Sequence, residues 1–141
     1  MRLLLALLVL AAAPARAEQV TSAEGAELRG LDKITGRTQD FTLRVGDTVR
    51  FGRLEVSLMD CRYPTDDPTS NAYAQIIVFD PVRGQADFDG WMVASSPALS
   101  ALDHPRYDVW VLRCLLPETA AAPEDDAAAD SDATSEDGSG G

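Results

Sequence analysis

The sequence predicts an all-β domain, a small barrel or sandwich of about six to eight strands with one short helical turn. Three observations support this fold class. Apolar residues alternate with polar ones over several short runs, and turn residues such as Gly-Asp and Asp-Pro separate these runs. A helical period of about 3.6 residues is missing after residue 17.

The expected strands of the first half are short and alternate apolar with polar residues. They span residues 26–33, 41–45, 48–51 and 54–61. Gly52 separates the last two, which predicts a tight turn or a bulge at that point.

The expected strands of the second half span residues 73–79, 88–94 and 107–115. The first of them is apolar almost without interruption, which predicts a strand buried on both faces. In the last strand, strict alternation places Cys114 on the same face as Trp110. Between the last two strands, a proline after a serine cap predicts the helical turn.

The chain divides into three segments. Residues 1–17 have the pattern of a cleavable signal peptide, with a basic start, an apolar run over residues 3–12 and a small-x-small motif before Glu18. That run is shorter than the roughly 20 residues of a membrane-spanning helix. Residues 18–117 form one β domain, and residues 118–141 form an acidic tail whose composition predicts disorder. We expect a periplasmic protein, peripheral to the inner membrane at most, with no direct membrane insertion after signal cleavage.

The charge argues against a basic binding surface. Residues 18–117 contain 15 acidic and 10 basic side chains, and the tail adds 8 acidic and no basic ones, for a mature net charge of −13. Phosphate binding needs clustered Lys and Arg. We therefore expect no nucleic-acid partner and no contact with anionic membranes through a basic surface.

The two cysteines, Cys61 and Cys114, are predicted to form a disulfide, because export places both where thiols oxidise. A metal pair would lack neighbouring His or Cys ligands. A redox pair usually has the close C-x-x-C spacing. We expect no metal and no cofactor.

The one histidine, His104, defines an enzymatic alternative. It lies between Asp103 and Pro105, with serines at positions 95, 96 and 100. A Ser/His/Asp hydrolase needs its nucleophile on a strained turn with a base in reach, and no G-x-S-x-G turn is present. The sequence favours a loop in which Asp103 and His104 bond the local backbone. A small periplasmic hydrolase using His104 and a nearby serine is the alternative.

Two acidic pairs suggest calcium or a glycosidase. Asp66 and Asp67 lie beside prolines in a loop, whereas Asp87 and Asp89 alternate with Phe88 as solvent-facing strand residues do. We interpret the first pair as part of a solvated loop and the second as a solvated strand face.

The candidate interface is the region from residue 90 to residue 107, an ordered loop on a β scaffold. Its candidate residues are Trp91, Met92, Leu99, Leu102, His104 and Tyr107. Leu99 and Leu102 are three positions apart, so one helical turn would place both on the same side. The opposing interpretation is that the two leucines plug the open end of the barrel.

The run from Gly90 through Pro105 into residues 107–114 resembles an exported alphaproteobacterial family, domain-of-unknown-function family 2155. Segments 31–36 and 51–62 fit the same pattern, so the resemblance covers most of residues 26–115. The family implies no catalytic residues. Its genes are associated with the neighbourhood of a small accessory subunit of respiratory complex I.

These observations favour a non-enzymatic exported module, an accessory or protein-interaction protein. The resemblance makes an inner-membrane respiratory complex such as complex I the first partner to consider, as an accessory subunit or assembly partner. Besides the hydrolase, a binder of cell-wall glycan or peptide is the other alternative.

Overall fold

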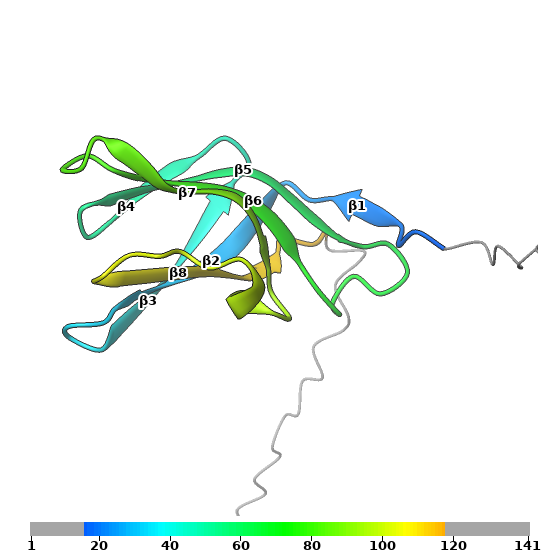
Figure 1. Cartoon of the computed structure of the whole chain (residues 1–141). Helices are drawn as coiled ribbons and strands as arrows, with labels where there is room; N and C mark the ends of the chain where they lie inside the picture. The colour runs from blue at the N-terminus through cyan, green and yellow to red at the C-terminus, as the bar shows by residue number, and fades with distance from the viewer. Residues whose placement is uncertain (1–15, 118–141) are drawn as a thin grey trace, which may run out of the picture.

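The computed structural model describes residues 16–117, which form two antiparallel sheets packed face to face (Figure 1). The elements are β1 (Val20–Ser22), β2 (Gly25–Asp32), β3 (Arg37–Arg44), β4 (Thr48–Phe51), β5 (Leu54–Pro64), β6 (Tyr73–Asp80), β7 (Gln85–Val93), the 3-10 turn η1 (Pro97–Leu99) and β8 (Tyr107–Cys114). This confirms the all-β fold class, and the architecture is a sandwich. Most of the predicted signal peptide and the predicted tail lie outside the described residues.

The larger sheet has five strands, in the order β1-β5-β6-β7, with β4 also paired to β5. β4 pairs with the start of β5 and β1 with its end, so the two short strands share one edge of β5. The smaller sheet has the order β3-β2-β8. The chain therefore changes sheet after β1, after β3 and after β7. Within the described part of the chain, no helix has the length and apolar character of a membrane span.

The core lies between the sheets, because each sheet buries only the face that meets the other. The largest fully buried apolar side chains are Leu28, Leu54, Val56, Leu58, Ile76, Val78, Met92 and Val111. β6 was expected to be buried on both faces, and this was wrong. Its residues alternate between buried and less buried positions, because nothing in the described chain covers the outer face of the larger sheet as a third layer would.

A register shift in the β2–β8 pairing leaves Leu112 without a partner residue. Cys114 therefore lies buried on the core face together with Val111, and not with Trp110 as alternation predicted. The predicted disulfide between Cys61 and Cys114 is confirmed, with the sulfur atoms 2.03 Å apart. It joins β5 of the larger sheet to β8 of the smaller one.

The two ends of the sandwich differ in construction. The described chain enters and leaves at the terminal end (Figure 1), and there the disulfide links the two sheets. At the hairpin end, the β2–β3, β4–β5 and β6–β7 turns project from the sandwich. Lys33 connects two segments of the hairpin end, because its Nζ donates to the carbonyl oxygen of His104 at 2.6 Å.

Candidate functional site

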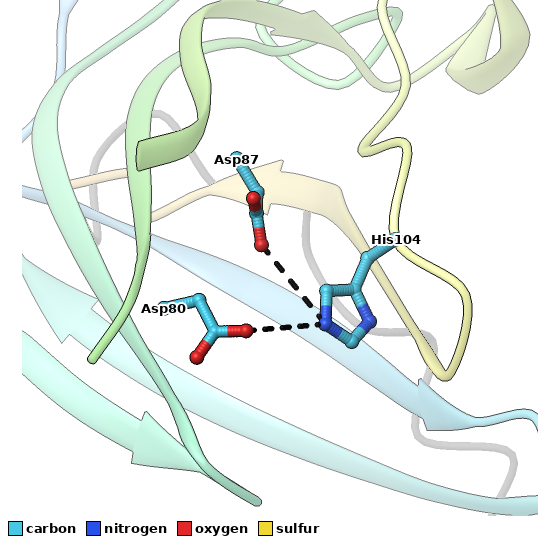
Figure 2. A group of neighbouring side chains, drawn as sticks. All are labelled: Asp80, Asp87 and His104. Atoms are coloured by element: carbon cyan, nitrogen blue, oxygen red, sulfur yellow. Dashed lines mark ion pairs between the residues drawn. The ribbon is translucent and has the colours of Figure 1, made fainter. Parts of the chain in front are cut away.

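A buried polar cluster closes the hairpin end. It consists of Asp80 at the end of β6, Asp87 in β7, His104 in the loop before β8, and Arg53 in the β4–β5 turn. The side chains of Asp80 and His104 are 0% exposed and that of Asp87 is 2% exposed. Figure 2 shows both carboxylates directed toward Nε2 of His104. The cluster thus brings together ionisable groups from three separate segments.

Asp87 reaches the interior because of a register shift in the β6–β7 pairing, which leaves it without a partner residue. The interpretation of Asp87 as part of a solvated strand face was therefore wrong, whereas Asp89 is exposed. One carboxylate oxygen of Asp87, Oδ1, lies 2.9 Å from Nη1 of Arg83. The other, Oδ2, is buried without a hydrogen-bond partner in the described structure.

The hydrogen bonds of His104 determine where its ring proton lies. Nδ1 accepts two backbone N–H groups, from Arg106 at 3.1 Å and from Tyr107 at 3.0 Å. An imidazole nitrogen that accepts carries no proton, so the proton of the neutral ring is on Nε2. The prediction that His104 bonds local backbone is confirmed.

Nε2 of His104 therefore carries a proton, and this N–H faces the carboxylates of Asp80 and Asp87. Oδ2 of Asp80 lies 3.6 Å away and Oδ2 of Asp87 lies 3.9 Å away. Nη2 of Arg53, a second donor, is 3.1 Å from Nε2, and it bonds the same Asp80 oxygen at 2.8 Å. Both donors thus face the same Asp80 oxygen, but only the guanidinium of Arg53 lies within hydrogen-bond distance of it.

This arrangement limits the chemistry of the cluster. The ligand-type atoms of Asp80, Asp87 and His104 lie within 4.8 Å of one another, a spacing that suits a cation. However, a protonated Nε2 has no lone pair with which to ligate a metal or to take a proton from a serine hydroxyl. The polar neighbours of that nitrogen, within the described residues, are two carboxylates and an arginine. The geometry therefore favours a structural role over metal binding or a hydrolase base.

Asp80 is the charged centre of the cluster. Burial by itself would raise the pKa of its carboxyl, but the backbone N–H of Val82 and the guanidinium of Arg53 outweigh burial and lower the pKa below its ordinary value. The Val82 N–H donates to Oδ1 at 2.9 Å and Arg53 Nε to Oδ2 at 3.0 Å. An ionised Asp80 thus fastens the β4–β5 turn to the β6–β7 hairpin.

Four of the six predicted interface residues are buried. Met92, Leu102, His104 and Tyr107 are between 1% and 5% exposed, so their side chains offer no surface to a partner. Leu99 is 80% exposed and Leu102 is 5% exposed, which contradicts the expectation that both lie on one side. The reason is that η1 ends at Leu99, and the chain then continues without helical repeat. The plug interpretation holds for Leu102 alone.

Trp91, the remaining predicted residue, lies on the outer face of the larger sheet beside Gln75. It lines a shallow groove of about 320 Å³. The other lining residues come from three strands and the segment before β1: Glu18, Val20, Arg62 and Tyr73.

The polar groups of this groove are fixed by neighbours. The guanidinium of Arg62 lies 5.0 Å from the centroid of the Trp91 ring, and its Nε donates to Asp60 Oδ2 at 2.8 Å. The hydroxyl of Tyr73 donates to Glu18 Oε2 at 2.7 Å, and this hydrogen bond, together with burial, raises the pKa of Tyr73. Sequence analysis did not identify Arg62 or Tyr73, because only the strand register brings them next to Trp91.

Comparisons with known proteins agree with the resemblance found in the sequence. The chain is 29% identical over 87 residues to "Uncharacterized protein RP359" of Rickettsia prowazekii (strain Madrid E), an alignment that covers 60% of this chain and 56% of that protein. The chain thus spans little more than half the length of this curated relative. No solved structure matches it. The family described as "Uncharacterized protein conserved in bacteria (DUF2155)" matches residues 26–114. The chain therefore belongs to the DUF2155 family.

Proposed function

We propose that this protein is an exported, non-enzymatic protein-binding module, and that its partner covers the groove around Trp91. The observation that carries this proposal is the combination of Trp91, Arg62 and Tyr73 on the outer face of the larger sheet. Trp, Tyr and Arg are the residue types that contribute most binding energy at protein interfaces.

The groove is preorganised for binding. Its aromatic residues lie on paired strands, and Asp60 and Glu18 hold the polar ends of Arg62 and Tyr73. Side chains that are already ordered lose little conformational entropy when a partner binds. The groove therefore has the properties of a binding surface in its free state.

A protein partner fits this groove better than a cell-wall glycan does. Sugar rings stack on open aromatic faces, but the Arg62 guanidinium already lies over the Trp91 ring. An apolar side chain of a partner can instead fill the space between Val20 and Trp91.

The disulfide supports a periplasmic location, since disulfides persist in oxidising compartments such as the periplasm. A partner complex in the inner membrane can hold a periplasmic protein at that membrane. The first partner to test is an inner-membrane respiratory complex such as complex I, because the family resemblance links these genes to an accessory subunit of that complex.

Affinity purification from detergent-solubilised envelopes tests the proposal. Tagged wild-type protein should retain a specific envelope protein, and Trp91→Ala should weaken its retention about 30-fold or more, because truncation of a hot-spot residue costs about 2 kcal/mol. Trp110→Ala is the matched control, since Trp110 lies half-buried on the smaller sheet, next to η1.

Thermal unfolding of each variant accompanies the purification, so that a loss of partner is separated from a loss of fold. Retention unchanged by Trp91→Ala contradicts the proposal. So does an equal loss for Trp91→Ala and Trp110→Ala at equal melting temperature.

A further inference from the structure

Two turns at the hairpin end share one design, although they belong to different sheets. The β2–β3 turn reads Asp-Lys-Ile-Thr-Gly from Asp32, and the β6–β7 turn reads Asp-Pro-Val-Arg-Gly from Asp80. In each, Oδ1 of the aspartate accepts the backbone N–H of the residue two positions later, at 3.0 Å for Ile34 and 2.9 Å for Val82.

Both turns also end in the same way. The backbone carbonyl of the aspartate accepts the N–H of the glycine four positions later, at 2.8 Å in both turns. These glycines, Gly36 and Gly84, have φ of +70° and +66°, which a side chain rarely permits. The two turns are therefore rigid and closely alike in backbone geometry.

The third position of each turn carries an exposed aliphatic side chain. Ile34 is 73% exposed and Val82 is 75% exposed. The turn uses only the backbone N–H of this residue, so its design does not require an apolar side chain there. A single exposed aliphatic residue is common on protein surfaces. Two such residues at the same position of two matching turns, at one end of the molecule, call for an explanation.

Basic side chains surround these two tips, and their acidic partners point inward. In the pairs Arg53–Asp80, Arg83–Asp87 and Arg106–Asp32, the arginines are 41%, 43% and 43% exposed, while the aspartates are 0%, 2% and 16% exposed. Arg37 adds an exposed cation beside Ile34, whereas the ammonium of Lys33 is held by the His104 carbonyl and by Asp108. The hairpin end thus presents cations to solvent, although the whole chain is strongly acidic.

We propose that the hairpin end docks on an anionic phospholipid surface, with Ile34 and Val82 inserted at the boundary between headgroups and acyl chains. Arg37 and Arg83 lie beside the two tips, where they can contact lipid phosphates. From the sequence we expected no contact with anionic membranes, because of the net charge and because phosphate binding needs clustered Lys and Arg. The fold brings arginines from separate segments to one end. Electrostatic screening acts over about 8 Å at physiological salt, so the local arrangement decides the contact.

A bilayer fits this surface better than a protein pocket does. The two tips belong to different sheets and project as separate points (Figure 1), and a bilayer offers a continuous apolar layer that accepts both. The surface is also distinct from the Trp91 groove, which lies on the outer face of the larger sheet. The described chain ends at the terminal end, away from the two tips.

Vesicle flotation tests the proposal. The protein is purified from the cells that express the whole chain, and it retains residues 118–141. Wild-type protein should bind vesicles that contain phosphatidylglycerol and phosphatidylcholine in equal parts, and bind phosphatidylcholine vesicles much less. The double variant Ile34→Ser/Val82→Ser should lose about tenfold or more of this binding. Leu99→Ser is the matched control, because Leu99 is equally exposed but lies on η1.

Arg37→Gln should weaken binding less than the double variant and reduce its dependence on salt, because Arg37 is an exposed cation beside Ile34. Melting temperatures of all variants should match that of the wild type, since each replaced side chain is exposed. Absence of wild-type binding to anionic vesicles overturns the proposal. It is also overturned if Leu99→Ser loses as much binding as the double variant, or if the double variant binds vesicles normally but no longer retains an envelope protein.

Discussion

The terminal end and the hairpin end hold the same two sheets together by different chemistry. At the terminal end, the bond between Cys61 and Cys114 is covalent and acts mainly by restricting the unfolded chain. At the hairpin end, Arg53 binds Asp80 within the larger sheet, and its Nη2 lies 3.1 Å from Nε2 of His104, in the loop that leads into the smaller sheet. These contacts act in the folded state only, and the ion pair of Asp80 with Arg53 depends on ionisation of the carboxylate. The two ends should therefore respond to different perturbations: the terminal end to reduction and the hairpin end to acid.

The largest effect is expected from loss of the disulfide. The paired cysteines are 53 residues apart, and closing a loop of this length contributes about 4 kcal/mol in the chain-entropy model. The variant Cys61→Ala/Cys114→Ala should lose about this much unfolding free energy, measured by urea titration. A loss below about 1 kcal/mol would mean that the terminal end does not depend on its covalent link.

Removal of His104 is the matching perturbation of the hairpin end. His104→Ala leaves the N–H groups of Arg106 and Tyr107 without their acceptor, and each buried unsatisfied donor costs about 1–3 kcal/mol. We expect a loss of about 2–4 kcal/mol in urea unfolding. His104→Asn should recover part of it, because an amide oxygen can replace Nδ1 as an acceptor. Equal losses for both variants would contradict the assigned acceptor role.

Two glycine-to-alanine substitutions at the hairpin end separate the cost of a steric clash from the cost of backbone strain at positive φ. Gly52 has φ of +58°, and a Cβ there would lie 2.5 Å from the Tyr107 hydroxyl oxygen. Gly52→Ala should therefore cost about 2 kcal/mol or more. Gly84→Ala, with φ of +66° and nothing within 4 Å, should cost only the strain, about 1 kcal/mol. Thermal unfolding of both variants measures the difference, and equal losses would mean that Tyr107 moves away freely.

Acid should weaken the hairpin end by the smallest amount. Arg106 lowers the pKa of Asp32 by hydrogen bonding, and the pKa of Asp80 is also lowered, although burial opposes this. A lowered carboxyl pKa contributes stability that is complete above the ordinary value of 3.8 and is lost as pH falls through the folded value. The melting temperature should be constant from neutral pH to about pH 5 and fall below about pH 4.

The variant Asp32→Asn tests whether the ion pair of Asp32 with Arg106 causes the fall in melting temperature at low pH. Asp32→Asn removes one of the two carboxylates, so its melting temperature should approach that of the wild type as the pH falls below 3.8. If the variant and the wild type differ by the same amount at every pH, the ion pair with Arg106 is not the source of the response.

The fold could be predicted because its signals are local. Alternation in β3 and β5 indicates strands whatever their partners, and the predicted signal peptide together with two cysteines predicts the disulfide. The face of Cys114 could not be predicted, since the register shift at Leu112 depends on how β8 pairs with β2. One inserted residue reverses every side chain that follows it.

The candidate sites depend on contacts between distant segments and were therefore largely hidden. Arg53 and His104 are 51 residues apart, and no local pattern links them. Asp87 alternates with Phe88 as an exposed residue would, but the bulge in β7 turns it inward. Trp91 was identified from its residue type, while Arg62 and Tyr73 become its neighbours only through the pairing of β5, β6 and β7.

In the proposed function, a partner protein covers the outer face of the larger sheet around Trp91. Photo-crosslinking in living cells tests it directly, with a photoreactive amino acid placed either at Gln75, which pairs with Trp91, or at Gln39, which is exposed on β3 of the smaller sheet. We predict a specific crosslink to an envelope protein from position 75 and none from position 39. No crosslink from position 75, or the same crosslinks from both positions, would contradict the account.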